Sequence, residues 1–151
     1  MGQYHKLINV TKKEYVSGFD IGMMAKHYEQ IGFQGSMADV LYCLMIAQGN
    51  ETRGGGDVEG HFLIGRWVGD DVAIVGDYYT ESSDYYKYRD LYDKVEEDKS
   101  YVDISSTARS MLEAVYPKLT FKKEWYVTIN DKGEQENTFI WKRTWKKEEA
   151  A

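Results

Sequence analysis

The C-terminal third of the sequence carries the pattern that most constrains the fold, a long alternation of apolar and polar side chains. Successive side chains of a β-strand point to opposite faces, so residues two apart share a face. After a turn at Asn130–Gly133, the alternation resumes at Thr138. It predicts an antiparallel hairpin of Phe121–Ile129 with Thr138–Trp145. One face of its first strand consists of Phe121, Lys123, Trp125, Val127 and Ile129.

A second hairpin is predicted in the middle of the chain. Phe62–Val68 and Val72–Tyr78 are both largely apolar and are separated by Gly69-Asp70-Asp71. Strands that are apolar on both faces are expected at the centre of a sheet. Tyr4–Val10 predicts a further strand near the N-terminus. After it, Thr11–Glu14 has the spacing of a capping box, which predicts a short helical turn.

Four longer segments have the signals of helices. Ser36 is a favourable N-cap residue and predicts a helix over Met37–Gln48, which Gly49-Asn50 would end. Asp103-Ile-Ser105-Ser106 predicts the start of a second helix, over Ser106–Tyr116. Side chains at intervals of three and four residues predict two more helices, over Asp20–Ile31 and Asp84–Val95.

These elements together define the expected fold class. Their order, which is strand, two helices, hairpin, two helices and hairpin, predicts an α+β fold. We expect a mostly antiparallel sheet of about five strands with three to four helices, in a single domain over residues 1–151. Residues 146–151 are expected to form a flexible tail. The predicted core contains the apolar side chains Leu41, Leu44, Met45, Ile64, Ile74, Leu112, Trp125 and Val127.

The composition excludes several classes of protein. The chain has 151 residues, with 25 acidic and 19 basic side chains and a net charge of −6, which disfavours binding to duplex nucleic acid. The single cysteine, Cys43, has no partner for an internal disulfide. No signal peptide and no apolar run long enough for a membrane span is recognisable. We therefore predict a cytoplasmic protein without a membrane partner.

A glycine-rich loop is the first candidate for a binding site. Arg53 is followed by Gly54, Gly55 and Gly56, and such loops can surround an anion with backbone N–H groups beside a guanidinium. The spacing matches neither the Walker A motif nor the dinucleotide-binding fingerprint, so the cofactor, if any, is unknown from the sequence. The alternative interpretation is a plain connector.

Arg66 is the second candidate, because it lies inside a predicted apolar strand. A buried guanidinium requires an anionic partner, so we expect Arg66 to contact either Asp77 on the neighbouring strand or an anionic ligand. Trp67 points to the opposite face, where it is either a core residue or a stacking platform. Tyr78 ends the second strand and is the other candidate for stacking.

Two further clusters support alternative interpretations. If residues 57–61 are extended, Asp57, Glu59 and His61 share one side and could bind a divalent metal or act as acid and base. The alternative is a solvated loop. Residues 77–103 contain seven tyrosines and nine acidic side chains against four basic ones. Tyrosine is enriched at interfaces, so this segment is either a binding surface or a cover for the sheet.

Several motifs resemble a group of uncharacterised small proteins of bacteria and their phages. They are the opening residues 1–9 with Lys13-Glu-Tyr15, and Ile64–Asp70 with Val75–Tyr78; Arg53–Asp57 and Asp103–Ser105 belong to the same resemblance. The group has no established activity. The resemblance therefore implies a bacterial or phage setting, in which small acidic proteins often counter host defence or sequester signalling molecules.

The leading functional hypothesis is a non-enzymatic binding protein for an anionic, nucleotide-like ligand. The ligand would contact Arg53–Gly56 and Arg66, with stacking on Trp67 or Tyr78. One alternative is an inhibitor that binds a host protein through the acidic, tyrosine-rich surface. Another is a metal-assisted hydrolase that uses Asp57, Glu59 and His61. A homodimer is also expected, through a sheet edge or the Tyr85–Tyr92 stripe.

Overall fold

The computed structural model describes residues 3–22, 30–48, 57–80 and 86–146. Within this part of the chain there are three α-helices and six strands, which confirms the predicted α+β class. The elements in chain order are β1 (His5–Asn9), β2 (Glu14–Ser17), the 3-10 helix η1 (Phe19–Ile21), α2 (Met37–Met45), β3 (Val72–Gly76), the 3-10 helix η2 (Tyr86–Tyr88), α3 (Leu91–Glu97), β4 (Val102–Asp103), α4 (Ser105–Val115), β5 (Leu119–Ile129) and β6 (Gln135–Trp145).

The first sheet has four strands in the order β3-β1-β2-β4. β1, which confirms the predicted N-terminal strand, pairs antiparallel with both β2 and β3, so that Leu7 lies opposite Val16 and Ile74. β4 is parallel to β2. The expected helical turn at Thr11–Glu14 is wrong, because Glu14 begins β2. The side chain of Asn9 accepts a hydrogen bond from Lys12 N (2.8 Å), which stabilises a tight β1–β2 turn instead.

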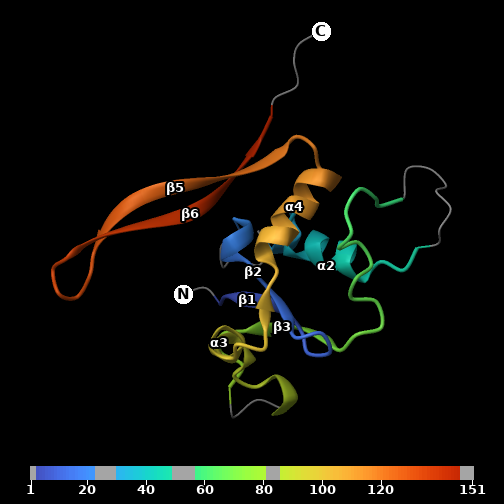
Figure 1. Ribbon diagram of the computed structural model, residues 1–151, viewed down its shortest axis with the longest axis horizontal. Helices are drawn as coiled ribbons and strands as arrows, with labels where there is room; N and C mark the ends of the chain where they lie inside the picture. The colour runs from blue at the N-terminus through green and yellow to red at the C-terminus, as the bar shows by residue number, and fades with distance from the viewer. Residues whose placement is uncertain (1–2, 23–29, 49–56, 81–85, 147–151) are drawn as a thin grey trace, which may run out of the picture.

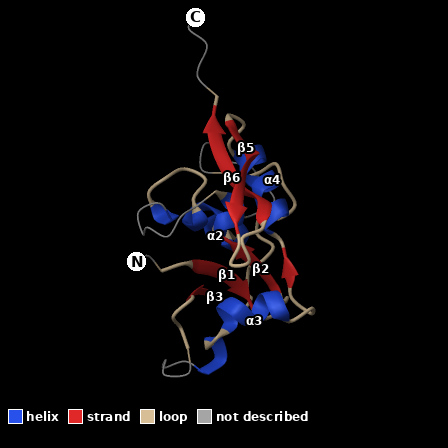
Figure 2. Ribbon diagram, turned by 90° about the vertical axis from the view of Figure 1, so that its left-hand side faces the viewer, coloured by secondary structure: helices blue, strands red, loops and turns tan. Residues whose placement is uncertain are grey.

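Both faces of this sheet are covered, which explains why β1 is apolar on both sides (Figures 1 and 2). Leu7 belongs to the larger core cluster, together with Leu44 of α2 and Leu112 of α4. Ile8 points to the other face and packs in a smaller cluster with Val95 of α3. Side chains that alternate along a strand are thus divided between two cores.

The predicted hairpin of Phe62–Val68 with Val72–Tyr78 is wrong in its first strand. Residues 61–69 form successive turns, in which Arg66 N donates to Leu63 O (3.0 Å) and Val68 N to Gly65 O (3.2 Å). Gly65 has φ of +79°, a conformation that favours glycine and interrupts a strand. β3 does form, but its partner is β1, with which Val72 to Gly76 pair.

A buried carboxylate attaches this turn segment to the sheet. Arg66 donates to both oxygens of Glu14, from Nε (3.0 and 3.2 Å) and from Nη2 (2.8 Å). The indole Nε1 of Trp67 donates to Oε1 of the same carboxylate (2.9 Å). The expected pairing of Arg66 with Asp77 is therefore wrong, and Asp77 Oδ1 accepts instead from Tyr4 N (3.2 Å).

The C-terminal hairpin is confirmed, and it projects from the rest of the structure as an arm (Figure 1). β5 and β6 pair over eleven residues each, with Trp125 opposite Phe139. Because no other described helix or strand covers the distal half of the arm, the expectation that Trp125 and Val127 are buried is wrong. Their side chains are 60% and 59% exposed.

The remaining predictions of core and helices have mixed outcomes. Leu44 and Leu112 are fully buried and Leu41 and Ile64 partly so, whereas Met45 and Ile74 are exposed at the rim of a pocket. α2 and α4 confirm the two predicted helices, although α2 already ends at Met45. Ser36 Oγ accepts from Asp39 N (3.4 Å), whereas the N-cap residue of α4 is Ile104, which forms no side-chain cap hydrogen bond.

The two periodic segments without strong caps are not continuous helices where they are described. Of Asp20–Ile31, residues 23–29 lie outside the described residues; Asp20 belongs to η1, whereas Gln30 and Ile31 are helical as predicted. The segment Asp84–Val95 contains η2 and the start of α3, separated at Asp90, which has φ of +61°. A left-handed residue at this position ends one helical turn before the next begins.

Glu14 should be essential for stability. Burial tends to raise its pKa, but the hydrogen bonds from Arg66 and Trp67 outweigh burial and hold the pKa below 4.5. Glu14→Ala leaves the indole N–H and the guanidinium without their acceptor. We expect a loss of about 3 kcal/mol in the free energy of unfolding, measured by urea denaturation at pH 7. A loss below about 1 kcal/mol would contradict this role.

The same carboxylate predicts a pH dependence. Because the folded-state pKa is lowered, ionised Glu14 stabilises the fold above the unfolded-state pKa, and this contribution disappears as the pH falls through the folded-state value. The difference in unfolding free energy between the wild type and Glu14→Gln should therefore be constant above pH 4.5 and shrink below it. A difference that does not change with pH would show that charge is unimportant at this position.

Candidate functional site

The base of the arm is held against the body by Arg143 of β6. Its Nη2 donates to the carbonyl oxygens of Ile21 (2.8 Å) and Gly35 (2.7 Å), and its Nη1 to that of Gln34 (3.3 Å). Gly22, which has φ of +72°, lies so close to β6 that an added Cβ would be 3.2 Å from Trp141 O. These contacts fix one edge of the arm beside η1.

A cleft is left where the arm passes the body, and we call it the arm–body cleft. It contains two adjoining pockets of about 280 and 440 Å³, which share Asp20, Phe139 and Trp141. The smaller one contains most of the charged groups. Its other lining residues are Asp103, Ser105, Ser106, Arg109 and Lys123.

An arginine from the body and an aromatic ring from the arm stack inside this cleft. The guanidinium carbon of Arg109, on α4, is 3.7 Å from the centre of the Trp141 ring. Arg109 also donates from Nη1 to the backbone oxygen of Asp20. Burial lowers the pKa of Arg109 below its usual value, but an arginine remains protonated at neutral pH. A fixed positive charge therefore lines the cleft.

Lys123 of β5 brings a second positive charge to the same ring. Its Nζ lies 5.5 Å from the Trp141 ring centre and 4.5 Å from that of Phe139. Within the described residues, no carboxylate forms an ion pair with it. Cation–π contacts of this kind hold an ammonium group in place without neutralising it. Lys123 is thus available to an anion.

Asp20 is the acidic group that both pockets of the cleft share. No hydrogen bond or ion pair to its carboxylate is present among the described residues. Its pKa is raised above 3.8 by burial and by the nearby charge of Asp103, although Arg109 acts in the opposite direction. Asp103 is satisfied in part, since Oδ1 accepts from Ser105 N (2.9 Å). A partly buried carboxylate with a perturbed pKa in a cleft marks a candidate functional group.

This combination of groups is chemically selective. Two cations can hold an anionic group, an unpaired carboxylate can accept hydrogen bonds from N–H or O–H donors, and aromatic rings can contact a flat ring system. A ligand that has all three features at once matches the cleft better than a simple anion. The two acidic side chains would repel an anion that brings no hydrogen-bond donors.

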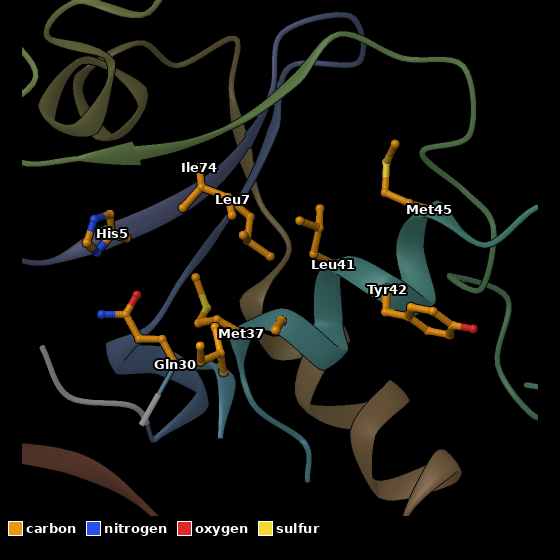
Figure 3. A pocket seen from close by; sticks show the side chains of 10 residues that line it. His5, Leu7, Gln30, Met37, Leu41, Tyr42, Met45 and Ile74 are labelled. Atoms are coloured by element: carbon orange, nitrogen blue, oxygen red, sulfur yellow. The ribbon is translucent and has the colours of Figure 1, made fainter. Parts of the chain in front are cut away.

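A second, apolar pocket of about 440 Å³ lies between the first sheet and α2 (Figure 3). Leu7 and Ile74 enter it from the strands, and Met37, Leu41 and Met45 from the helix. The ring of His5 and the amide of Gln30 lie at the end away from Met45 (Figure 3). The pocket is lined almost entirely by carbon, so it suits an uncharged, apolar group.

Only part of the predicted anion site lies within the described residues. Arg53, Gly54, Gly55 and Gly56 lie outside the described residues. Arg66 is paired with Glu14, and Trp67 is a fully buried core residue, so it has no face open for stacking. Tyr78 is exposed, but it follows β3 at the far end from the turn that carries Arg66.

The predicted metal site is also without support in the structure. Asp57, Glu59 and His61 are not part of a strand, so the expected common face does not exist. His61 Nδ1 accepts a hydrogen bond from Leu63 N (3.2 Å), and burial lowers the pKa of its imidazole. Among the described residues no group of three His, Cys, Asp or Glu side chains could hold a metal ion.

The cleft residues were missed because they are far apart in sequence. Asp20, Arg109 and Lys123 come from three separate elements, and no local motif joins them. One signal was present in the hairpin pattern, since the register places Lys123 directly opposite Trp141. A lysine in an otherwise aromatic strand face departs from local consistency, and such departures are where a functional site is sought first.

Comparisons with known proteins leave the site to be interpreted from its own chemistry. No family model, no curated protein and no solved structure matches this chain. In the described part of the chain, no helix has both the length and the apolar character of a membrane span.

Asp20 should reduce stability, as expected of a functional group held in an unfavourable environment. Its raised pKa means that ionisation is disfavoured in the folded state, so stability is lost as the pH rises above 3.8. Asp20→Asn should therefore raise the melting temperature at pH 7 and have little effect below pH 3.8.

Asp70 provides the matched control. Hydrogen bonds from Lys12 and Asn9 lower its pKa, so the corresponding change, Asp70→Asn, should decrease the melting temperature at pH 7. If both variants shift the melting temperature in the same direction, the electrostatic account of Asp20 is wrong.

Proposed function

We propose that this protein is a non-enzymatic binding protein whose arm–body cleft holds an anionic, nucleotide-like ligand. The observation that carries the proposal is the pair of cations, Arg109 and Lys123, over the one ring of Trp141. Like charges beside a single ring repel each other, and an anionic ligand group would relieve that repulsion. The ligand class is the one expected from the sequence, but the residues are different.

The other groups of the cleft fit the remaining parts of a nucleotide. Asp20 can accept hydrogen bonds from base N–H groups or sugar hydroxyls, and Ser105 and Ser106 offer two hydroxyls on the same wall. Phe139 and the exposed ring of Trp125, which are in contact with a centroid separation of 4.9 Å, offer aromatic surface for a base. A protein that only binds its ligand requires no catalytic residue in addition to these groups.

A thermal-shift series tests the ligand class. Nucleoside mono- and triphosphates at about 1 mM should raise the melting temperature, since a ligand that binds only the folded state stabilises it. Nucleosides without phosphate and inorganic phosphate alone should have a smaller effect, because each engages only part of the cleft. Equal shifts with inorganic phosphate would indicate a simple anion site and contradict the proposal.

The substitution Lys123→Met tests whether the nucleotide binds in the cleft or elsewhere on the arm. The substitution removes the charge but keeps an unbranched side chain over Phe139, so the fold should be retained. Nucleotide affinity should fall roughly tenfold, about 1.4 kcal/mol, in isothermal titration calorimetry. Lys132→Met is the matched control, because this exposed lysine lies in the turn between β5 and β6 and lines neither pocket of the cleft. Equal losses for both variants would show a general charge effect.

A second candidate, a protein partner, is favoured by the distal half of the arm. Trp125, Val127 and Ile129 share one face of β5, and each is more than half exposed. Contiguous exposed apolar side chains mark interaction surfaces. By contrast, Tyr92 and Tyr101 of the acidic segment pack against the smaller core, and Tyr88 donates to Asp71, so much of the predicted tyrosine surface has a structural role.

The partner that we propose for the distal face is a second copy of the chain. Two-fold assemblies are the commonest, and the ribbon offers the same apolar face and two unpaired strand edges on both copies. Light scattering should show a dimer at high concentration, and Val127→Asp should convert it to a monomer. A monomer at every concentration for the wild-type protein would end this idea.

A further inference from the structure

The arm has a second face, opposite the aromatic one, whose base is strongly basic. In β5 and its flank, Lys118, Thr120 and Lys122 share this face, and Thr144, Lys142 and Lys146 lie across from them in or beside β6. We call these six residues the lysine–threonine face. All four lysine side chains belong to exposed residues, and the base of the aromatic face packs on the body behind them.

The register brings like charges directly together. Lys122 is the cross-strand neighbour of Lys142, and Lys146 N donates to Lys118 O (2.8 Å), which continues the pairing by one step. Between these two pairs the hydroxyls of Thr120 and Thr144 are 2.8 Å apart. Like charges that face each other across two strands are destabilising. Among the ion pairs between described residues, Glu124 approaches Lys142 at 3.3 Å, and both of these side chains are more than half exposed.

The rest of the chain has the opposite charge. Residues 118–146 contain seven basic and four acidic side chains, whereas the other residues contain twelve basic and twenty-one acidic ones. The positive charge is therefore concentrated on an arm that projects from an acidic protein (Figure 1). Such a separation favours a polyanionic partner along the arm and disfavours a broad one that would also meet the body.

We infer that the lysine–threonine face binds the phosphate backbone of a single-stranded nucleic acid. Residues two apart on a strand are about 6.7 Å apart, close to the spacing of successive phosphates in an extended strand. Two lysine rows with hydroxyl donors between them make a strip that is one phosphodiester chain wide. Tyr126, next on the same face beyond Glu124 and 45% exposed, offers a ring on which a base can stack.

This inference uses different cations from the arm–body cleft, although Tyr126 also lines the larger of the two cleft pockets. A single strand also fits the net charge better than a duplex does. Both backbones of a duplex carry charge, and the strand away from the arm would approach the acidic body. The feature that the lysine–threonine face would recognise is a flexible chain with regularly spaced phosphates.

Fluorescence anisotropy with a labelled oligothymidylate of about twenty nucleotides tests the inference directly. If four phosphates are neutralised, the logarithm of the association constant should fall with the logarithm of salt concentration with a slope of about −2.8. The double variant Lys122→Gln, Lys142→Gln should lower the affinity roughly tenfold and make the slope shallower by about 1.4.

The control has the same loss of charge elsewhere. Lys94→Gln with Lys99→Gln removes two exposed lysines of the body and should leave both affinity and slope unchanged. An equal loss in both double variants, or no binding at low salt, would overturn the inference. So would tighter binding of a duplex of the same sequence, or equal binding of inorganic polyphosphate. Circular dichroism of each variant confirms that the arm is folded.

Discussion

The carboxylate of Glu14 is the contact on which the body of the structure depends. It begins β2, is almost completely buried, and accepts hydrogen bonds from Arg66 and from the indole of Trp67. Trp67 is among the largest fully buried side chains, and its backbone N–H donates to Leu44 O at the end of α2. One ionised group therefore joins the sheet, the turn segment and a helix. Satisfying a buried carboxylate with two strong donors is what makes its burial tolerable.

The arm depends in turn on Arg143, which reaches three backbone oxygens of the body. A planar guanidinium is suited to several acceptors at once, and backbone carbonyls near η1 and before α2 supply them. This anchoring places Trp141 beside Arg109 and so creates the cleft. The functional proposals on the two faces of the arm share this one structural premise, although they use different lysines.

Much of the fold was predictable, and the candidate site was not. The hairpin of residues 119–145 follows from alternation, and α2 follows from the N-cap residue Ser36. The start of α4 follows from Asp103, whose side chain accepts a hydrogen bond from Ser105 N. The prediction of a strand over residues 62–68 was wrong because an apolar run is compatible with a buried strand and with a series of buried turns. Only the positive φ of Gly65 distinguishes the two structures. The exposure of Trp125 could not be predicted, because alternation shows which residues share a strand face but not whether another element packs against that face. Asp20, Arg109 and Lys123 meet only through tertiary structure.

The strict alternation along β5 and β6 has a consequence for how this arm can vary among related chains. Adding one residue to each strand between the base and the tip would keep the ribbon paired but exchange the faces of everything beyond the insertion. Adding two residues to each strand would lengthen the arm by about 6.7 Å and leave both faces intact. Insertions that preserve function should therefore come in matched, even-numbered steps. The length of the arm can therefore change, but only by an even number of residues in each strand.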